Sequence, residues 1–443
     1  MRIQLSDHFD YKKLLRFVMP SIIMMIFTSV YGVIDGFFVS NFAGKTSFAA
    51  INLIMPVLMI LGTLGFMIGA GGSAIVAKTL GEGRTQTAKQ YFSMLIYVTI
   101  AGGIFFTILG ETLLRPITVL LGATDNMVDD CVLYGRIILI TLTPFMLQNV
   151  FQSFLITAEK PKFGLAVTVA AGCTNIVLDF LFVGIFKWGL IGAASATAIS
   201  QLIGGIIPLV YFLRPNNSTL SLTRAKLDKK ILIKTCTNGS SELMTNISMS
   251  LVNILYNFQL MKFAGENGIA AYGVIMYTAF IFVTVFIGYS IGSAPIIGFH
   301  YGAQNSSELK NLFRRSLVII SVSGIFMTTL ALLLAMPLSL IFVGYDETLF
   351  NMTTRGFMMY SSSFIICGIN IFASSFFTAL NNGGVSAAIS FLRTLVFQII
   401  AVLVLPLILG LDGIWLSILL AEIMALIVAI TCFVVFRKKY NYT

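Results

Sequence analysis

The most unusual residues in this sequence are carboxylates that lie inside long apolar stretches. Asp179 is the single charged residue in 164–186, a stretch long enough to cross a lipid bilayer. Asn175 precedes it by one helical turn, and Tyr31 precedes Asp35 in the same way, so each carboxylate shares a helix face with a hydrogen-bonding side chain. A charge at bilayer depth costs about 2.5 to 3.5 kcal/mol even on lenient insertion scales. Such residues therefore normally face a cavity or a partner.

A buried carboxylate beside an amide or a hydroxyl can carry a proton or bind a cation. Burial favours the protonated form of a carboxyl group, which suits a proton carrier. Oxygens from Asp, Asn and Thr instead suit a hard cation such as Na⁺. The sequence does not choose between H⁺ and Na⁺.

Three further ionisable residues lie within apolar segments. Glu242 is near the expected start of a helix, where a carboxylate either contacts substrate or interacts with the helix dipole. Arg393 and Glu422 are expected to be structural.

The composition excludes a soluble protein. Of the residues, 57% are hydrophobic and 10% are charged, whereas a soluble domain carries about 25% charged residues. The apolar residues form twelve blocks of about the length that a membrane-spanning helix needs. They run approximately over 14–39, 48–77, 91–114, 132–155, 163–186, 189–213, 233–261, 269–299, 316–342, 356–380, 385–409 and 413–436. The sequence thus predicts an all-α integral membrane protein.

The net charge of +10 reflects orientation in the membrane better than a nucleic-acid partner. Most of the 28 Lys and Arg residues fall on the side of both termini, which predicts that both termini are cytoplasmic. We therefore expect a multi-pass protein of a bacterial plasma membrane. Its predicted units are a cytoplasmic N-terminus at 1–13, a six-helix bundle at 14–213, a cytoplasmic linker at 214–232, a second bundle at 233–436 and a cytoplasmic C-terminus at 437–443.

The sequence predicts neither removal of an N-terminal signal peptide nor a disulfide framework. Residues 1–17 contain two aspartates and no small-residue cleavage site, so we expect the first helix to remain in the mature protein. The five cysteines are odd in number and mostly apolar in context, which argues against a disulfide framework.

An internal duplication relates the two halves. FAGKTSFAAINLIM at 42–55 recurs as FAGENGIAAYGVIM at 263–276, an offset of 221 residues, half the chain. Each half contains six predicted helices, so both halves enter the membrane from the same side, as in parallel-repeat transporters. Under this offset, Asp35, Asn175 and Asp179 correspond to Tyr256, Val396 and Ile400. The ion site is therefore expected in the first half alone.

Other motifs do not indicate an enzyme. GAGGSA at 69–74 fits a dinucleotide pattern, but it lies inside an apolar helix and is expected to be a helix-packing patch. The sequence has no phosphate-binding loop, and with two histidines it has no zinc-protease motif. We expect no enzymatic activity and no cofactor other than H⁺ or Na⁺ as coupling ion.

Several motifs resemble the multidrug and toxic compound extrusion (MATE) family, whose twelve helices form two six-helix lobes around a central cavity. MPSIIMMIFTSVYGVIDGFFVS is similar to the family's opening pattern, with Pro20 fifteen residues before Asp35. NIVLDFLFVGIFKWGLIGAASATAIS matches its N-x-x-x-D pattern and the small-residue run that follows. The loops TLGEGRTQTAK and HYGAQNSSELK are similar to the family's glycine turns, although Glu82 replaces the usual Ala.

The resemblance implies an antiporter that exports organic cations, drugs or other amphipathic compounds by alternating access, driven by H⁺ or Na⁺. It places the coupling-ion site at Asp35, Asn175, Asp179 and Thr197, with Tyr31 and Pro20 as supporting residues. Pro20 would let the first helix bend. The candidate substrate-binding residues are Glu242, Gln148, Asn149 and Tyr256. A monomer with small amphipathic or cationic substrates, in a lipid bilayer and without nucleic acid, is expected.

Two alternatives remain open. A flippase for a lipid-linked precursor would be expected to show several buried Lys or Arg, and the sequence offers Arg393. A non-coupled channel or receptor would need no counter-ion gradient, and Asp179 would then be dispensable for its flux.

Overall fold

The fold is a set of long helices. The structure is a computed structural model, and it describes residues 3–42 and 45–443; the remaining four residues, two of them in the predicted unit 1–13, lie outside the described residues. Within these ranges there is no β-strand, which confirms the predicted all-α class.

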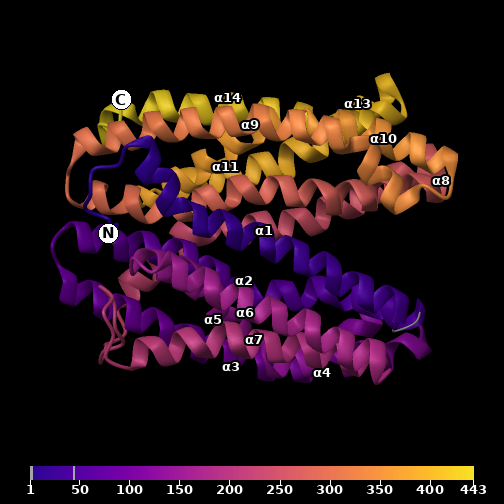
Figure 1. Cartoon of the computed structure of the whole chain (residues 1–443), viewed down its shortest axis with the longest axis horizontal. Helices are drawn as coiled ribbons and strands as arrows, with labels where there is room; N and C mark the ends of the chain where they lie inside the picture. The colour runs from indigo at the N-terminus through magenta and orange to yellow at the C-terminus, as the bar shows by residue number, and fades with distance from the viewer. Residues whose placement is uncertain (1–2, 43–44) are drawn as a thin grey trace.

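The helices divide into two bundles, which lie side by side in Figure 1. The N bundle contains α1 (Tyr11–Phe42), α2 (Lys45–Gly81), α3 (Thr85–Leu120), α4 (Asp125–Ile140), α5 (Leu142–Thr157), α6 (Pro161–Asp179), the π-helical turn η1 (Phe180–Ile185) and α7 (Gly189–Leu213). The C bundle contains α8 (Lys229–Gly302), α9 (Ser306–Val343), α10 (Glu347–Ser361), α11 (Phe364–Ala379), α12 (Gly383–Phe391), the π-helical turn η2 (Leu392–Val396), α13 (Phe397–Leu409) and α14 (Leu411–Tyr440).

These helices form twelve membrane-crossing segments. In the described part of the chain nine helices are long and apolar enough to cross a membrane, or eleven if the bent pairs α4–α5 and α10–α11 each count as one span. The 74-residue α8 adds the twelfth, because it breaks at Gly265, where φ is 62°. Tyr256 and Tyr272 stack across this break with ring centroids 4.9 Å apart, so the two halves of α8 fold back on each other.

Several helices extend beyond their predicted limits. The predicted second bundle begins at 233, but α8 begins at Lys229, because the Asp228 side chain accepts hydrogen bonds from the backbone N–H groups of Lys230 and Ile231 and caps the helix there. The predicted tail at 437–443 is also mostly helical, since α14 continues to Tyr440. Hydropathy marks the apolar part of a helix and misses its polar ends.

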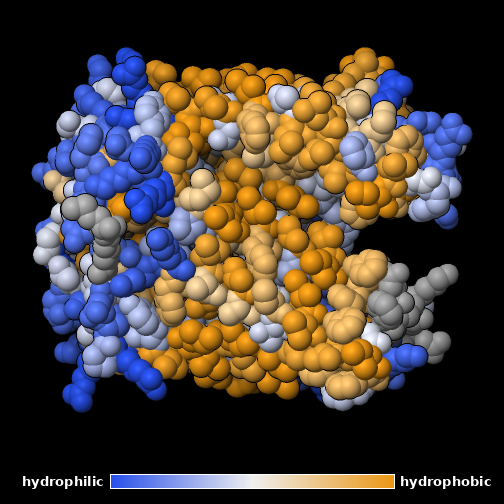
Figure 2. Space-filling model, viewed as in Figure 1, coloured by the Kyte–Doolittle hydropathy of each residue, from blue (hydrophilic) through white to orange (hydrophobic). Residues whose placement is uncertain are grey.

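The surface matches a protein that spans a membrane. Figure 2 shows a broad hydrophobic band across the middle of the face in view. Hydrophilic residues gather at the end that holds both termini, which we call the terminal end (Figures 1 and 2). At the opposite end, the far end, Figure 2 shows the molecule hollowed between the two bundles.

Towards the terminal end, glycines allow the backbones of the two bundles to come into close contact, and we call these contacts the glycine seal. A Cβ at Gly81 would lie 2.0 Å from the carbonyl oxygen of Phe299, and one at Gly302 would lie 2.0 Å from that of Lys78. Deeper in the bundles, a Cβ at Gly71 would lie 2.2 Å from the carbonyl oxygen of Thr235. Gly71 belongs to the stretch 69–74, so the prediction of this stretch as a packing patch is confirmed; Gly71 packs against the other bundle, whereas Gly69 packs against α5 of its own bundle.

Substitution of one of these glycines should open the seal. Gly302→Ala places a methyl group against backbone of α2, and overpacking of this kind costs about 1 to 3 kcal/mol. We expect a lower apparent Tm in detergent and greater labelling of cysteines placed along the seal. Gly273→Ala is the matched control, because a Cβ there meets nothing within 4 Å. Equal stability of the two variants would contradict the tight seal.

Candidate ion-binding site

The predicted acidic residues meet inside the N bundle. Asp35 on α1 has three polar side chains as its neighbours, those of Asn175 and Asp179 on α6 and that of Thr197 on α7. Asp179 is 0% exposed and Asn175 is 1% exposed. All four residues of the predicted ion site therefore lie close together, on three different helices.

This cluster has more hydrogen-bonding capacity than its protein neighbours use. Within the described residues no partner is found for Asp35 Oδ1, for either carboxylate oxygen of Asp179 or for the side-chain nitrogen of Asn175. Buried polar atoms in native proteins normally have a hydrogen-bond partner. A buried polar atom without one needs an explanation, such as a bound ion. Two carboxyl groups and neutral oxygens suit a proton or a small hard cation.

Close packing of α1 against α6 brings the two acids together. A Cβ at Gly172 would lie 2.8 Å from the Tyr31 ring and 2.5 Å from that of Phe27, so a larger residue would push α1 away. On the other side of α6, the Ser200 hydroxyl donates to the carbonyl oxygen of Ala171 at 2.8 Å and fixes α7. The small-residue runs of α6 and α7 thus set the size of the site.

The backbone changes its winding directly after Asp179. Residues Phe180–Ile185 form the π-helical turn η1, which adds an extra residue per turn. Such turns occur frequently at functional sites, because they redirect the side chains that follow. Here η1 begins at the residue that follows Asp179.

Two tyrosines border the acid pair. Tyr31 lies near Asp35, as predicted, and its hydroxyl also approaches the side chain of Gln148, one of the candidate substrate residues. Tyr134 on α4 also lies near both acids, and it is 3% exposed. Sequence reasoning missed Tyr134, because nothing in the surrounding α4 sequence distinguishes it from a packing aromatic.

Glu242 stands apart from the acid pair. It is half-buried on α8, and its carboxylate makes no hydrogen bond or ion pair with another described residue. It lies more than three turns after the first residue of α8, Lys229, at about 3.6 residues per turn. The dipole interpretation is therefore wrong, because that effect fades within the first turn.

The remaining predicted residues are engaged in packing. The Asn149 side chain donates to the carbonyl oxygen of Phe145 at 2.9 Å. The Tyr256 hydroxyl donates to Gln398 Oε1 at 3.0 Å, and its ring is stacked on Tyr272, so it belongs to the interior of the C bundle. α1 continues without interruption through Pro20.

Comparison with known proteins identifies the family. The family model MatE matches residues 20–181 and 243–404, which together make up more than half of the chain. The chain belongs to the MatE family. It is therefore a membrane transporter and not an enzyme. The two matched stretches begin 223 residues apart (243 − 20) and lie one in each bundle, which agrees with the internal duplication.

Several known proteins are similar over nearly the whole MatE chain. Multidrug export protein MepA of Staphylococcus saprophyticus is 24% identical over 432 residues, covering 97% of this chain and 94% of that protein. A structure described as the outward-facing conformation of a multidrug resistance MATE family transporter has a TM-score of 0.93 and 22% identity, and covers 98% of both chains. A structure of MATE in complex with MaL6 has a TM-score of 0.92 at 22% identity, covering 98% of this chain and 97% of that one. These likenesses confirm the fold.

The C bundle of this MatE protein contains a buried ion pair in place of an acid pair. Arg393 in η2 donates from Nε to Glu422 Oε1 at 2.8 Å and to Oε2 at 3.0 Å, and its Nη2 lies 2.8 Å from Oε1. Asn370 on α11 donates to the same carboxylate at 2.6 Å. Glu422 is 1% exposed. The pair ties η2, α14 and α11 together, as the structural interpretation of Arg393 and Glu422 predicted.

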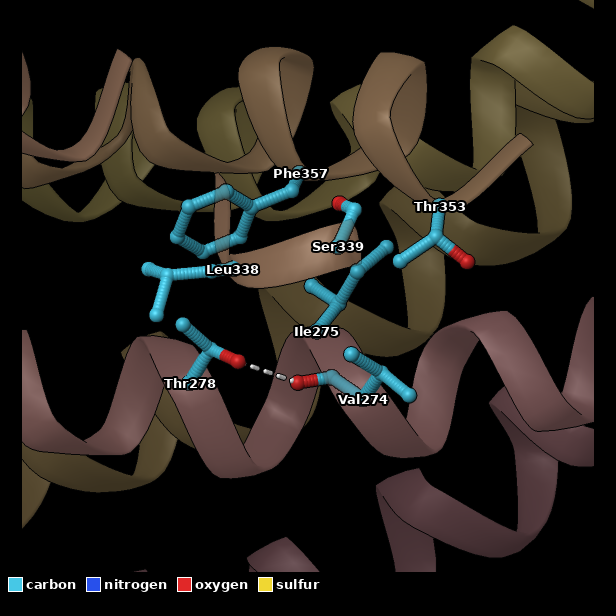
Figure 3. Close-up of a pocket in the computed structure, with 7 residues that line it drawn as sticks. All are labelled: Val274, Ile275, Thr278, Leu338, Ser339, Thr353 and Phe357. Atoms are coloured by element: carbon cyan, nitrogen blue, oxygen red, sulfur yellow. Dashed lines mark hydrogen bonds between the residues drawn. The ribbon is translucent and has the colours of Figure 1, made fainter. Parts of the chain in front are cut away.

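A gap in the C bundle is unsuited to substrate. It lies between α8, α9 and α10 and is drawn in Figure 3. Its lining is mostly apolar. The Thr278 hydroxyl donates a hydrogen bond to the carbonyl oxygen of Val274 at 2.7 Å (Figure 3). It holds no ionisable side chain and is a packing defect.

A double-mutant cycle tests the Arg393–Glu422 pair. Arg393→Met leaves a buried carboxylate without its cation, and Glu422→Gln leaves a buried guanidinium, so each should cost about 3 to 5 kcal/mol. The double variant removes both charges and should recover most of that loss. Apparent Tm in detergent is the measurement. Additive losses in the double variant would show that the two side chains do not form a pair.

Proposed function

We propose that this protein is an H⁺- or Na⁺-coupled antiporter that exports organic cations, drugs or other amphipathic compounds by alternating access. The observation that carries the proposal is the buried pair Asp35 and Asp179, in which Asp35 Oδ1 and both carboxylate oxygens of Asp179 have no hydrogen-bond partner within the described residues. Two facing carboxylates cannot both stay ionised without a cation, because like charges in a low-dielectric site repel strongly. A proton or a Na⁺ ion satisfies both.

The ion's effect on shape follows from where its ligands lie. Asp35 belongs to α1, which also packs against α8 of the other bundle: a Cβ at Gly288 of α8 would lie 2.6 Å from the Cα of Ile22 on α1. Binding of the ion draws α1 to α6, and its loss lets the two carboxylates repel. An ion that binds one arrangement more tightly shifts the population toward it. The site thus couples ion occupancy to the packing between bundles.

The proposed orientation of the protein in the membrane rests on its surface charge. The hydrophilic terminal end carries most of the Lys and Arg residues, which supports a cytoplasmic position for this end. The glycine seal then closes the cytoplasmic side and the hollow faces outward (Figure 2). In this arrangement the ion enters from outside as substrate leaves.

Two observations support export of cationic or amphipathic compounds. The MepA proteins similar to this chain are named multidrug export proteins. Glu242 offers a half-buried carboxylate without a partner, which suits an organic cation. A flippase for a pyrophosphate-linked lipid is less well supported, because Arg393 is already neutralised by Glu422.

Transport by proteoliposomes tests the proposal. A fluorescent organic cation is followed under an imposed H⁺ gradient and, separately, under a Na⁺ gradient. One gradient should drive uphill transport by the unmodified protein, and Asp179→Asn should reduce the driven component by roughly 5- to 150-fold, the usual range of coupling energies.

Asp129→Asn is the matched control for this experiment. It makes the same chemical change at a side chain that is 80% exposed. Asp129 Oδ1 lies 3.7 Å from Arg115 Nη2. It should transport like the unmodified protein. Equal gradient-driven transport by Asp179→Asn would contradict coupling through the acid pair.

A further inference from the structure

The segment that precedes α1 connects the two bundles at the terminal end. Leu5 is 1% exposed and Phe9 is 0% exposed, although they belong to an irregular stretch outside the helices. Residues 3–10 are therefore docked and do not form a free tail (Figure 1, indigo). We call this segment the strap.

One end of the strap is held by the C bundle. Glu308, in the first turn of α9, accepts hydrogen bonds from the backbone N–H of Phe9 at 2.9 Å and from His8 Nδ1 at 2.6 Å. Asn311, one turn later, donates to the carbonyl oxygen of Phe9 at 2.9 Å. The Phe9 ring packs edge-on against His300, with centroids 6.5 Å apart.

The other end is held by the N bundle. The backbone N–H of Leu5 donates to Glu159 Oε1 at 2.9 Å. Glu159 lies in the turn between α5 and α6, so the strap runs from one bundle to the other within a few residues.

Glu159 has a backbone conformation that few residues with a side chain adopt. Its φ is 59°, and Lys160 N–H bonds to the carbonyl oxygen of Leu155 at 2.8 Å, which is the left-handed turn that ends many helices. Glycine or asparagine normally fills such a turn, since the backbone of other residues is strained there. A carboxylate at this strained position reaches the strap.

The matching turn of the C bundle follows the usual rule. Between α11 and α12 it has Asn381, with φ 58°, and its side chain approaches the carbonyl oxygen of Ala74 on α2 at 3.4 Å. Both turns thus contact the opposite half of the molecule at the terminal end. In the C bundle the contact is direct, and in the N bundle it runs through the strap.

We propose that residues 3–10 form a strap that holds the terminal end closed, with Glu159 and Glu308 as its positioning residues. The two anchored N–H groups, of Leu5 and Phe9, are four residues apart, and a fully extended chain of that length spans at most about 14 Å. The bundles therefore cannot part widely at this end unless one anchor is released. This inference rests on the proposed alternating access.

The distance between spin labels at the terminal end tests the strap. Lys162 on α6 and Lys310 on α9 are exposed and belong to different bundles, so cysteines at these positions in a cysteine-free background report separation of the two bundles. Electron–electron resonance is recorded in detergent and in lipid nanodiscs, without substrate or ion gradient. The unmodified protein should give a predominant short-distance population and a minor long-distance one.

Glu159→Asn is the sharpest variant. Asparagine suits the left-handed backbone, so folding should be maintained and the apparent Tm should not fall, while the shorter side chain gives up the Leu5 anchor. The ratio of long-distance to short-distance populations should rise roughly tenfold, as expected for loss of a hydrogen bond to a charged group. Glu308→Gln should produce a shift in the same direction, because Glu308 uses both carboxylate oxygens and glutamine can keep an acceptor for Phe9 N–H but not a second one for His8 Nδ1.

Two controls separate the strap from other effects. Glu159→Gln retains an oxygen acceptor for Leu5 N–H, so the distance between the spin labels should stay largely as short as in the unmodified protein. Glu111→Gln removes a carboxylate from an α3 side chain that faces Arg136 and touches no part of the strap, and should change nothing. Unchanged distances in both Glu159→Asn and Glu308→Gln would contradict the proposal that the strap holds the terminal end closed.

The readout is independent of ion coupling. If Asp179→Asn still transports normally but Glu159→Asn separates the labels, the proposed coupling fails and the strap stands. If Asp179→Asn loses driven transport while the labels stay together in both strap variants, the coupling stands and the strap fails.

Discussion

The structure depends on one electrostatic constraint, which is that two carboxyl groups face each other inside a lipid-embedded bundle. Neither Asp35 nor Asp179 has a basic partner among the described residues, and Asn175 and Thr197 are the polar groups beside them. The C bundle resolves the same kind of problem with a fixed cation, Arg393 against Glu422. We propose that the N bundle instead takes up an exchangeable cation, and this asymmetry is what a coupled transporter requires.

The contacts between the bundles give this site something to control. Glycines at the terminal end bring α2 and α8 into backbone contact, and the strap crosses between the bundles beside them. Backbone-to-backbone packing of this kind has few intermediate states, so it favours either a closed or an open end. A small displacement of α1 at the acid pair can therefore be converted into a change at the opposite end of the molecule.

The sequence predicts the fold and most of the ion site, because those signals are local or repeated. Apolar blocks gave the membrane-crossing segments, the 221-residue offset gave the two bundles, and single charges in apolar helices marked Asp35 and Asp179. Contacts between distant segments could not be predicted in this way. Tyr134 approaches the acids only through the fold, and Glu159 and Glu308 meet the strap across two bundles. Glu242 was misplaced because the cap at Asp228 lies outside the apolar block.

The central claim is that ion binding at the acid pair shifts the protein between two arrangements. Substrate and ion should then oppose each other's binding, and equilibrium binding tests this most directly. The Kd of a fluorescent organic cation is measured in detergent over a range of pH at fixed Na⁺, and over a range of Na⁺ at fixed pH. The account predicts that the Kd of the unmodified protein rises with one of the two ions, and that this dependence is lost in Asp35→Asn and Asp179→Asn. The same ion dependence in the variants as in the unmodified protein would contradict it.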